Sequence, residues 1–304
     1  MKHFLLYTFL LLLLGSNLQA QIRIQDAHLT GKLYRFEKVK PRFLEARNID
    51  VWVPEDFDSS GRTRYAVLYM HDGQNLFLPG YSFGGQEWGI DEAMDSLLRR
   101  GLIRKTIVVG IWNSPKRFIE YNPEDAFKKL DSLNKQKITL ERGGTTLANQ
   151  YLDFVFETVK PLIDSVFPTK PEAKNTFMMG SSMGGLISLY ALCKHSEQLK
   201  AVACVSTHWP LSLKENNAQV AEQYIAYFAR HLPNPKQHKL YFDHGTTTLD
   251  AWYEPHQLLM DSLCKESGYE TPKDFMSLVF PGEPHNEIAW RKRVGIPLKF
   301  LLQP

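Results

Sequence analysis

Residues 176–192 read Thr176-Phe177-Met178-Met179-Gly180-Ser181-Ser182-Met183-Gly184-Gly185-Leu186-Ile187-Ser188-Leu189-Tyr190-Ala191-Leu192. The stretch begins with residues typical of a buried strand, passes through Gly-x-Ser-x-Gly, and ends in an apolar run long enough for a helix. A strand, a sharp turn and a helix in this order expose the serine hydroxyl beyond the end of a sheet, where a base can take its proton. The stretch predicts that Ser182 is a nucleophile and that the N–H of Met183 stabilises an oxyanion.

The same five-residue pattern occurs once more, as Gly80-Tyr81-Ser82-Phe83-Gly84. The preceding residues 75–79 have loop character, and no strand adjoins the serine. Since the chemistry requires the strand and the helix around the turn, we interpret Ser82 as a loop residue.

Strand-like and helix-like segments alternate on both sides of the Ser182 stretch. Apolar runs of strand length occur at 49–53, 65–70, 106–111, 176–179, 201–205, 239–242 and 276–280. Segments with helical spacing occur at 91–100, 147–167, 184–194, 219–230 and 255–267. This alternation predicts an α/β fold with a mostly parallel central sheet and helices on both faces, and it places the chemistry beyond the carboxyl ends of the strands.

The first twenty of the 304 residues have the three regions of a secretory signal peptide: Lys2-His3, the apolar run from Phe4 to Leu14, and a small-residue end at Ala20. The apolar run is shorter than the roughly 20 residues that span a bilayer. We expect cleavage after Ala20, export to the periplasm or the medium, and no stable membrane insertion afterwards. Residues 21–304 then form a single α/β domain.

The composition excludes several classes of function. Hydrophobic residues at 43% and charged residues at 23% are typical of a soluble globular protein. The net charge of +3 arises from 36 basic and 33 acidic side chains without a basic block, so nucleic acid is not an expected partner. The three cysteines, Cys193, Cys204 and Cys264, indicate neither a disulfide framework nor a cysteine metal site. The oligomeric state is left open.

A base and an acid for Ser182 follow in the order that α/β-hydrolases use: serine, acid, histidine. His285 comes directly after the last predicted strand and is the expected general base. Asp243 ends the preceding strand, whereas Asp250 lies deeper in the loop that follows it. We favour Asp250 because a carboxylate has to reach the far nitrogen of the imidazole, and Asp243 remains the alternative.

A second oxyanion donor is expected after the strand at 65–70, where the sequence reads His71-Asp72-Gly73-Gln74-Asn75. This position supplies a backbone N–H in α/β-hydrolases, which makes Gly73 or Gln74 the partner of Met183. His71 and Asp72 are adjacent, so their side chains point in different directions, and no third ligand is spaced nearby. We therefore expect no metal.

Together, these motifs resemble the putative-esterase family, which is similar to esterase D and to feruloyl, acetylxylan and enterochelin esterases and mycolyltransferases. The segments that carry the resemblance are 69–77, Val109-Gly110-Ile111-Trp112-Asn113, Arg117-Phe118-Ile119-Glu120-Tyr121, 180–185 and Gly282-Glu283-Pro284-His285. The resemblance implies hydrolysis or transfer of an acyl group without a cofactor. It also implies that Ser182 is the nucleophile, His285 the base, Asp250 the acid, and Gly73, Gln74 and Met183 the oxyanion donors.

The substrate site is less defined by the sequence. Trp112 and Trp209 follow predicted strands and are candidates to stack on a sugar or an aromatic acyl group, with core packing as the alternative. His208 also follows a predicted strand, and we expect it either to line the acyl pocket or to anchor its loop. Arg117 and Glu120 are expected to pair with each other or to stay solvated. The expected substrate is an acylated carbohydrate, an acetyl or feruloyl ester, followed by a siderophore ester. Acyl transfer and a non-catalytic binding protein on the same scaffold are the remaining alternatives.

Overall fold

The computed structural model describes residues 21–304, so the predicted signal peptide lies outside the described residues. The described chain forms one nine-stranded sheet with the strand order β1-β2-β3-β5-β4-β6-β7-β8-β9. The strands are β1 (Gln21–Ile24), β2 (Lys32–Val39), β3 (Arg47–Val53), β4 (Ala66–His71), β5 (Thr106–Ile111), β6 (Thr176–Ser181), β7 (Ala201–Val205), β8 (Lys239–His244) and β9 (Phe275–Val279).

The sheet is mixed but mostly parallel, as the alternation of segments predicts. Strands β4 to β9 are parallel to their neighbours, whereas β3 is antiparallel to β5, and β2 and β1 continue antiparallel from it. Every residue of β4, β5 and β6 is buried, which explains their continuous apolar sequences. The antiparallel strands β1 and β2 were not predicted, because β1 is short and β2 carries alternating charges that break the apolar pattern.

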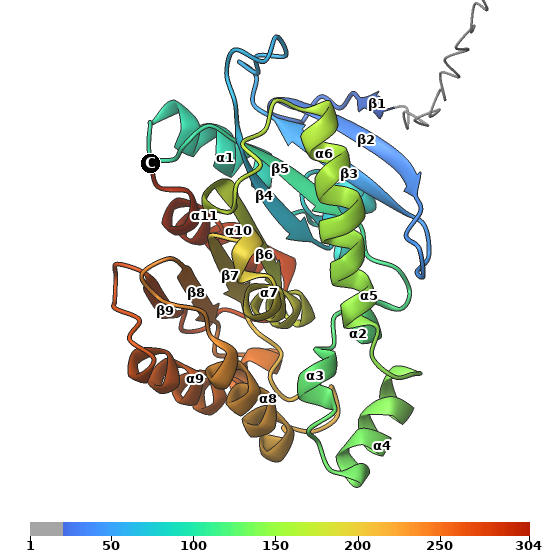
Figure 1. Cartoon of the computed structure of the whole chain (residues 1–304), viewed down its shortest axis with the longest axis vertical. Coiled ribbons are helices and arrows are strands. Elements are labelled where there is room, and N and C mark those ends of the chain that lie inside the picture. Colours follow the sequence, from blue (N-terminus) through green and yellow to red (C-terminus); the bar gives the residue numbers. More distant parts are fainter. Residues whose placement is uncertain (1–20) are drawn as a thin grey trace, which may run out of the picture.

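Helices cover both faces of the sheet (Figure 1). They are α1 (Ile90–Arg99), α2 (Arg117–Glu120), α3 (Glu124–Phe127), α4 (Ser132–Arg142), α5 (Ala148–Asp153), α6 (Lys160–Val166), α7 (Met183–Lys194), α8 (Ala218–His231), α9 (Glu254–Glu266), α10 (Glu287–Arg293) and α11 (Gly295–Leu302). A π-helical segment, Phe154–Val159, joins α5 to α6, so the predicted helix at 147–167 is one helical stretch with a local widening. Helix α4 was not predicted, because its sequence is largely polar.

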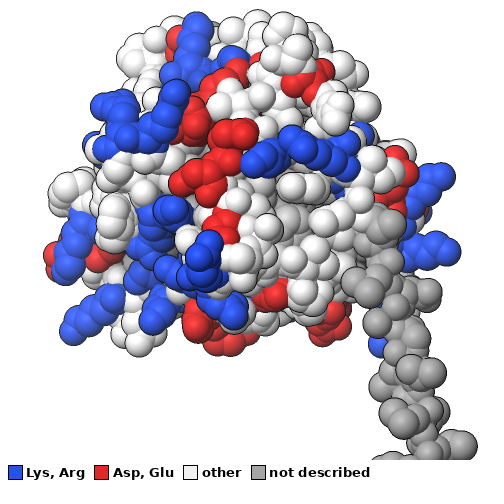
Figure 2. Space-filling model, turned by 90° about the horizontal axis from the view of Figure 1, so that it is seen from above, with Lys and Arg blue, Asp and Glu red and all other residues white. Residues whose placement is uncertain are grey.

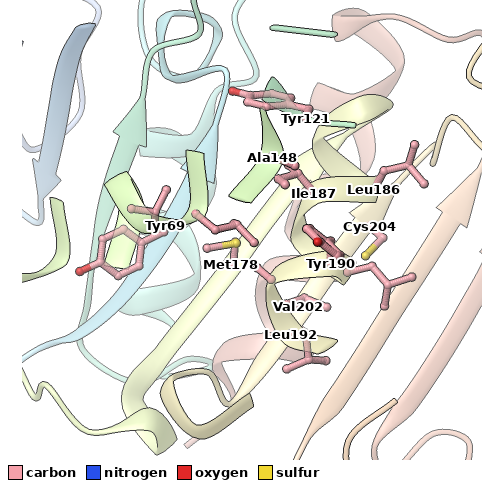
Figure 3. Packing of buried hydrophobic residues seen from close by; sticks show 14 of the residues in the cluster. Tyr69, Tyr121, Ala148, Met178, Leu186, Ile187, Tyr190, Leu192, Val202 and Cys204 are labelled. Atoms are coloured by element: carbon pink, nitrogen blue, oxygen red, sulfur yellow. The ribbon is translucent and has the colours of Figure 1, made fainter. Parts of the chain in front are cut away.

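Two hydrophobic cores lie on the two faces of the sheet, since successive strand residues point to opposite sides. Tyr69 and Met178 belong to the larger core, which packs against α5 to α9. Leu68 and Phe177 belong to the other core, which packs against α1, α10 and α11. Figure 3 shows the larger core, where Leu186, Tyr190 and other residues of α7 meet Val202 and Cys204 of β7. Helix α7 is therefore anchored directly on the strands that position its first turn.

Charged side chains of both signs occur together on the face of the molecule shown in Figure 2. In the part of the chain that the structure describes, no helix is both long enough and apolar enough to cross a membrane. The loops that carry the candidate functional residues follow the carboxyl ends of β4, β5, β6, β7, β8 and β9, so they lie along one edge of the sheet.

Candidate active site

Ser182 lies at the turn between β6 and α7, where the sequence places it. Its backbone has φ 58° and ψ −121°, a conformation that a residue with a side chain adopts only under strain. Two backbone hydrogen bonds hold the turn: the N–H of Ser182 donates to Val205 O at 2.9 Å, and the N–H of His208 donates to Ser182 O at 3.2 Å. The serine is partly exposed, whereas its neighbours Ser181 and Met183 are buried. The turn therefore presents this hydroxyl outwards.

The glycines of the motif are required by close packing. A Cβ at Gly180 would lie 2.8 Å from the backbone of Gly184, where the chain doubles back. A Cβ at Gly185 would lie 2.8 Å from Thr207 Oγ1, in the segment after β7. Glycine at these positions lets the first turn of α7 approach the sheet and the neighbouring loop.

His285 and Asp250 are in direct contact. The imidazole Nδ1 of His285 lies 2.5 Å from Asp250 Oδ1, and the Asp250 side chain is fully buried. Asp250 Oδ2 accepts hydrogen bonds from Ser206 Oγ at 2.7 Å and from Gly245 N at 2.5 Å. Burial would raise the pKa of Asp250, but the hydrogen bonds from His285 and Ser206 and the backbone outweigh it and hold the pKa below its ordinary value.

Asp243, the alternative acid, forms hydrogen bonds with residues other than His285. Its Oδ1 accepts from Arg293 Nη2 at 3.0 Å, and its Oδ2 accepts from Tyr241 Oη at 2.8 Å. Burial raises the pKa of Asp243 despite the nearby guanidinium. Of the two aspartates, the structure brings only Asp250 to the imidazole, because Asp250 lies in the turn after β8, which is bonded to the segment before His285, whereas Asp243 stays within β8.

A shell of residues that sequence reasoning did not identify supports this pair. Besides donating to Asp250, Ser206 Oγ accepts hydrogen bonds from Trp290 Nε1 and Arg293 Nη2, both at 3.0 Å. The Trp290 ring also meets the His285 ring edge-to-face, with centroids 5.0 Å apart. The sequence could have indicated these residues: Ser206 directly follows a strand, and Trp290 and Arg293 are three residues apart, so they lie on the same face of one helix.

Ser182 and His285 share no direct hydrogen bond among the described residues. The two are linked through the end of β7, where Val205 accepts from Ser182 N and the next residue, Ser206, holds Asp250. Because Nδ1 faces Asp250, the nitrogen of His285 that remains for the serine is Nε2. Such serine–base contacts are often longer in a free enzyme than in its substrate complex.

The loop after β4 contains Gly73 and Gln74, the two residues that the sequence predicts as oxyanion donors. Asp72 adopts a left-handed conformation with φ 56°, and the 3-10 turn Gly73–Asn75 begins directly after it. A Cβ at Gly73 would lie 2.4 Å from the carbonyl carbon of Gly110, so the position admits only glycine. The first N–H groups of a helical turn have no partner within it, which applies to Gly73 and Gln74 here and to Met183 at the start of α7.

A clamp of charged and polar side chains, Arg117 and Asn113, holds this loop against the turn that carries Ser182. Arg117 donates to Asp72 from Nε at 2.6 Å and from Nη2 at 2.7 Å, and Nη2 also reaches Ser181 O at 3.3 Å. Asn113 Nδ2 donates to Asp72 Oδ1 at 2.6 Å. The nearby guanidinium outweighs burial and lowers the pKa of Asp72. Arg117 thus bridges the residue before Gly73 and the residue before Ser182.

This arrangement corrects the expectation that Arg117 and Glu120 pair with each other or stay solvated. Glu120 is fully buried and accepts from Arg47 Nη1 at 2.7 Å and from Ser114 Oγ at 2.8 Å. The two charges separate because Glu120 binds Arg47 of β3, whereas Arg117 binds Asp72, the residue after β4.

His71 is buried, and its ring packs against Tyr121 and Tyr151. Its Nδ1 lies 2.7 Å from Tyr151 Oη, and burial lowers the pKa of His71 to about 3, so the ring is neutral at pH 7. Among residues 21–304, no group of three histidine, cysteine, aspartate or glutamate side chains is arranged to hold a metal ion.

The three candidate substrate-binding residues occupy different surroundings. Trp112 is partly exposed and follows β5 beside Gln74. His208 is fully buried below Ser182 with its Nδ1 2.7 Å from Tyr253 Oη, and burial together with His285 keeps its pKa well below the ordinary value. Trp209 does not line the site: it is fully buried between Phe228 and Phe242, because the chain after β7 turns back into the core.

Comparison with known proteins identifies the family. The family described as "Putative esterase" matches residues 42–264, which covers most of the described chain and includes Ser182 and Asp250. The chain belongs to this esterase family. A relative from Bacillus subtilis (strain 168), the uncharacterized protein YbbA, is 24% identical over 166 residues, which are 54% of this chain and 58% of the relative.

Solved esterase structures share the fold of this family member. A ferulic acid esterase superposes with a TM-score of 0.63 at 17% identity, over 90% of this chain and 98% of that chain. An IroE-like serine hydrolase from Shewanella oneidensis gives 0.59 at 21% identity, over 88% and 78%. The ferric enterobactin esterase from Salmonella typhimurium gives 0.56 at 14%, over 88% and 57%. At these identities the likeness establishes the α/β-hydrolase fold and not the substrate.

Proposed function

We propose that this esterase-family protein is a serine carboxylic-ester hydrolase that acts through an acyl-enzyme on Ser182. One observation supports the proposal above the others: the buried Asp250 holds Nδ1 of His285, and so leaves Nε2 for a serine on a strained turn. The N–H groups that open η1 (Gly73–Asn75) and α7 have no partner within their own helical turns, and we propose them as the oxyanion donors.

In the proposed reaction, Ser182 Oγ attacks the ester carbonyl carbon while His285 Nε2 takes the hydroxyl proton. The carbonyl oxygen becomes an oxyanion that accepts from Met183 N–H and from Gly73 or Gln74 N–H. His285 then passes the proton to the leaving alcohol, and the acyl group remains on Ser182. Water, deprotonated by His285, attacks the acyl-enzyme, and His285 then returns the proton to Ser182 Oγ as the carboxylic acid is released. Asp250 keeps the imidazole oriented and stabilises its charged form.

For the substrate we propose an acylated carbohydrate, as an acetyl or feruloyl ester. The similarity to a ferulic acid esterase over nearly its whole length supports this class. A siderophore ester is the second candidate, favoured by the enterobactin esterases among the structural relatives. An acyltransferase would use the same acyl-enzyme but a sugar alcohol in place of water, and product analysis with added acceptor separates the two. A binding protein without activity would fail every ester assay.

The test is hydrolysis of 4-nitrophenyl acetate by the wild type and by Ser182→Ala. We expect the variant to lose turnover by about four to six orders of magnitude at unchanged stability. Ser188→Ala is the matched control: Ser188 lies on α7, and its hydroxyl donates to Gly184 O within the helix. Ester hydrolysis by a folded Ser182→Ala protein at the wild-type rate would refute the mechanism.

We also propose that the protein is exported after removal of residues 1–20. The sequence of this segment supports the proposal. Amino-terminal sequencing of the protein from the periplasm or the medium should begin at Gln21, and a cell-associated protein that starts at Met1 would contradict it.

A further inference from the structure

One pocket of the structure lies away from the proposed catalytic residues, where α1, α10 and α11 pack together on the sheet (Figure 1). Its volume is about 500 Å³, within the range of about 300–1,000 Å³ that is typical of sites for small molecules. Residues of these helices, of β9 and of the adjoining loops line it, whereas Ser182, Asp250 and His285 do not. The proposed mechanism therefore leaves this pocket without a role.

The pocket has apolar walls. Its apolar lining side chains are Leu97, Leu102, Met276, Ile296 and Phe300. Leu97 and Phe300 belong to the hydrophobic core of this sheet face and are buried, whereas Ile296 is 39% exposed. The apolar surface thus extends from the core to the outside. An apolar group bound there would remove part of this surface from water, which is favourable.

Every charged side chain that lines the pocket is a cation. Arg100, Lys292 and Lys299 are exposed, and Lys292 donates to Glu283 at 3.1 Å. The side chains of Arg100 and Lys299 form no hydrogen bond or ion pair with any residue in the described part of the chain. Charges of one sign around a cavity with apolar walls concentrate the electrostatic potential inside it. The pocket therefore attracts an anion.

Arg293 forms the buried side of the pocket. Its Nη2 donates to Asp243 Oδ1 and to Ser206 Oγ, both at 3.0 Å, so the guanidinium is held in place. Its Nη1 is buried and has no hydrogen-bond partner within residues 21–304. A buried N–H group without a partner is rare in native proteins, because it loses its hydrogen bonds to water without a replacement. The pocket therefore adjoins a cation whose hydrogen bonds are incomplete.

The walls and the charges together select the class of anion. A carboxylate accepts strong hydrogen bonds from guanidinium and ammonium groups. Inorganic phosphate would also satisfy these cations, but it would leave the apolar walls in contact with water. A neutral apolar molecule would cover the walls and leave the cations without a partner. A carboxylate that carries an apolar body meets both conditions.

We propose that this pocket binds a monocarboxylate with an apolar body, such as a medium-chain fatty acid. The carboxylate binds Arg100 and Lys299, and the apolar body packs on the walls that Ile296 and Phe300 provide. The site is separate from the proposed catalytic site, and its function as a binding site does not depend on ester hydrolysis. The acid that the proposed reaction releases belongs to the same chemical class when its acyl group is apolar, so a reaction product is one candidate ligand.

The experiment measures the dissociation constant of sodium octanoate by isothermal titration calorimetry. Two further probes are 1-octanol, which lacks the charge, and inorganic phosphate, which lacks the apolar body. The variants are Arg100→Gln, Lys299→Gln and the double variant, with Lys265→Gln as the control because Lys265 is an exposed lysine near the end of α9 and outside the pocket. We expect each single substitution to raise the Kd for octanoate by about 2- to 5-fold, as for the loss of one exposed ion pair, and the double variant to raise it by about 4- to 25-fold. The control should stay within about 1.5-fold of the wild type.

The wild type should bind octanoate at least about fivefold more tightly than 1-octanol or phosphate. Equal affinity for octanoate and 1-octanol would show that the cations take no part, and equal affinity for octanoate and phosphate would show that the walls take none. An octanoate Kd that Arg100→Gln and Lys299→Gln leave unchanged would place the ligand at another site, such as the active site. Each of these results, or no detectable binding of octanoate, overturns the inference. The proposed function is tested separately, since Ser182→Ala should lose ester hydrolysis and keep the wild-type affinity for octanoate.

Discussion

Replacing Arg117 by methionine tests whether the Arg117 clamp holds the loop after β4, which carries the proposed oxyanion donors Gly73 and Gln74. Methionine retains much of the apolar stem but removes the two hydrogen bonds to Asp72, at 2.6 and 2.7 Å, and the contact with Ser181 O at 3.3 Å. Asp72 sits in a left-handed conformation directly before Gly73, so without the clamp it can relax and carry the donor N–H away from the substrate.

The contacts of Arg117 determine the size of two expected effects, a fall in kcat and a loss of stability. Loss of a whole oxyanion donor reduces kcat by about 10²- to 10³-fold, and this is the upper limit. Because Asn113 still donates to Asp72 at 2.6 Å, we expect a fall in kcat of about 10- to 100-fold with little change in KM. Breaking a buried ion pair costs about 3–5 kcal/mol of stability, and the 21% exposure of the Arg117 side chain favours the lower end.

The assay is saturation kinetics with 4-nitrophenyl acetate together with urea unfolding of each variant. Arg117→Lys keeps the charge but not the two-pronged geometry and should give intermediate kcat. The double variant Arg117→Met, Asp72→Asn removes the unpaired carboxylate, so it should regain most of the lost stability while kcat stays low. If a folded Arg117→Met protein keeps kcat within about threefold of wild type, the clamp does not position the donor.

Two further substitutions test other parts of the site. Asp250→Asn should lower kcat by about 10³- to 10⁴-fold, because the neutral amide no longer stabilises the charged imidazole. Asp243→Asn should reduce stability in urea unfolding and leave kcat of the folded protein nearly unchanged. Equal effects of the two substitutions on kcat would contradict the choice of Asp250 as the acid. Gly73→Ala should lower the free energy of unfolding by more than about 3 kcal/mol, because its Cβ would lie 2.4 Å from Gly110. Gly80→Ala is the control and should be neutral, because a Cβ there meets nothing within 4 Å. A stable Gly73→Ala protein would show that the loop can move aside.

The sequence predicted the parts of this molecule that depend on continuous apolar runs and on short-range order. The strands at 106–111 and 201–205 begin and end where the apolar runs do, and Ser182 lies at the predicted turn. The same reasoning missed β2, whose charged residues Arg35 and Lys38 obscure the pattern, and it placed Trp209 at the site although it is buried in the core. Both errors arise from tertiary contacts that the sequence pattern does not show. Arg35 of β2 pairs with Asp50 of the adjacent strand β3, and Trp209 packs on α8 and β8.

Backbone strain is a second property of the site that composition and spacing could not reveal. Among residues 21–304, six residues other than glycine have positive φ, and four of them, Asp72, Ser182, Ser206 and Thr248, lie in the loops that hold the candidate catalytic groups. Each costs about 1–3 kcal/mol and persists only where surrounding contacts impose it. Asp72 accepts hydrogen bonds from Arg117, and the N–H of Ser182 donates to the carbonyl of Val205. Ser206 Oγ donates to the Asp250 carboxylate, and Thr248 Oγ1 accepts from the N–H of His285 at 2.8 Å. Because each of these four strained residues is held by a contact from a neighbouring segment of the site, the loops support one another. Removing a single contact should therefore affect more of the site than the residue that made it.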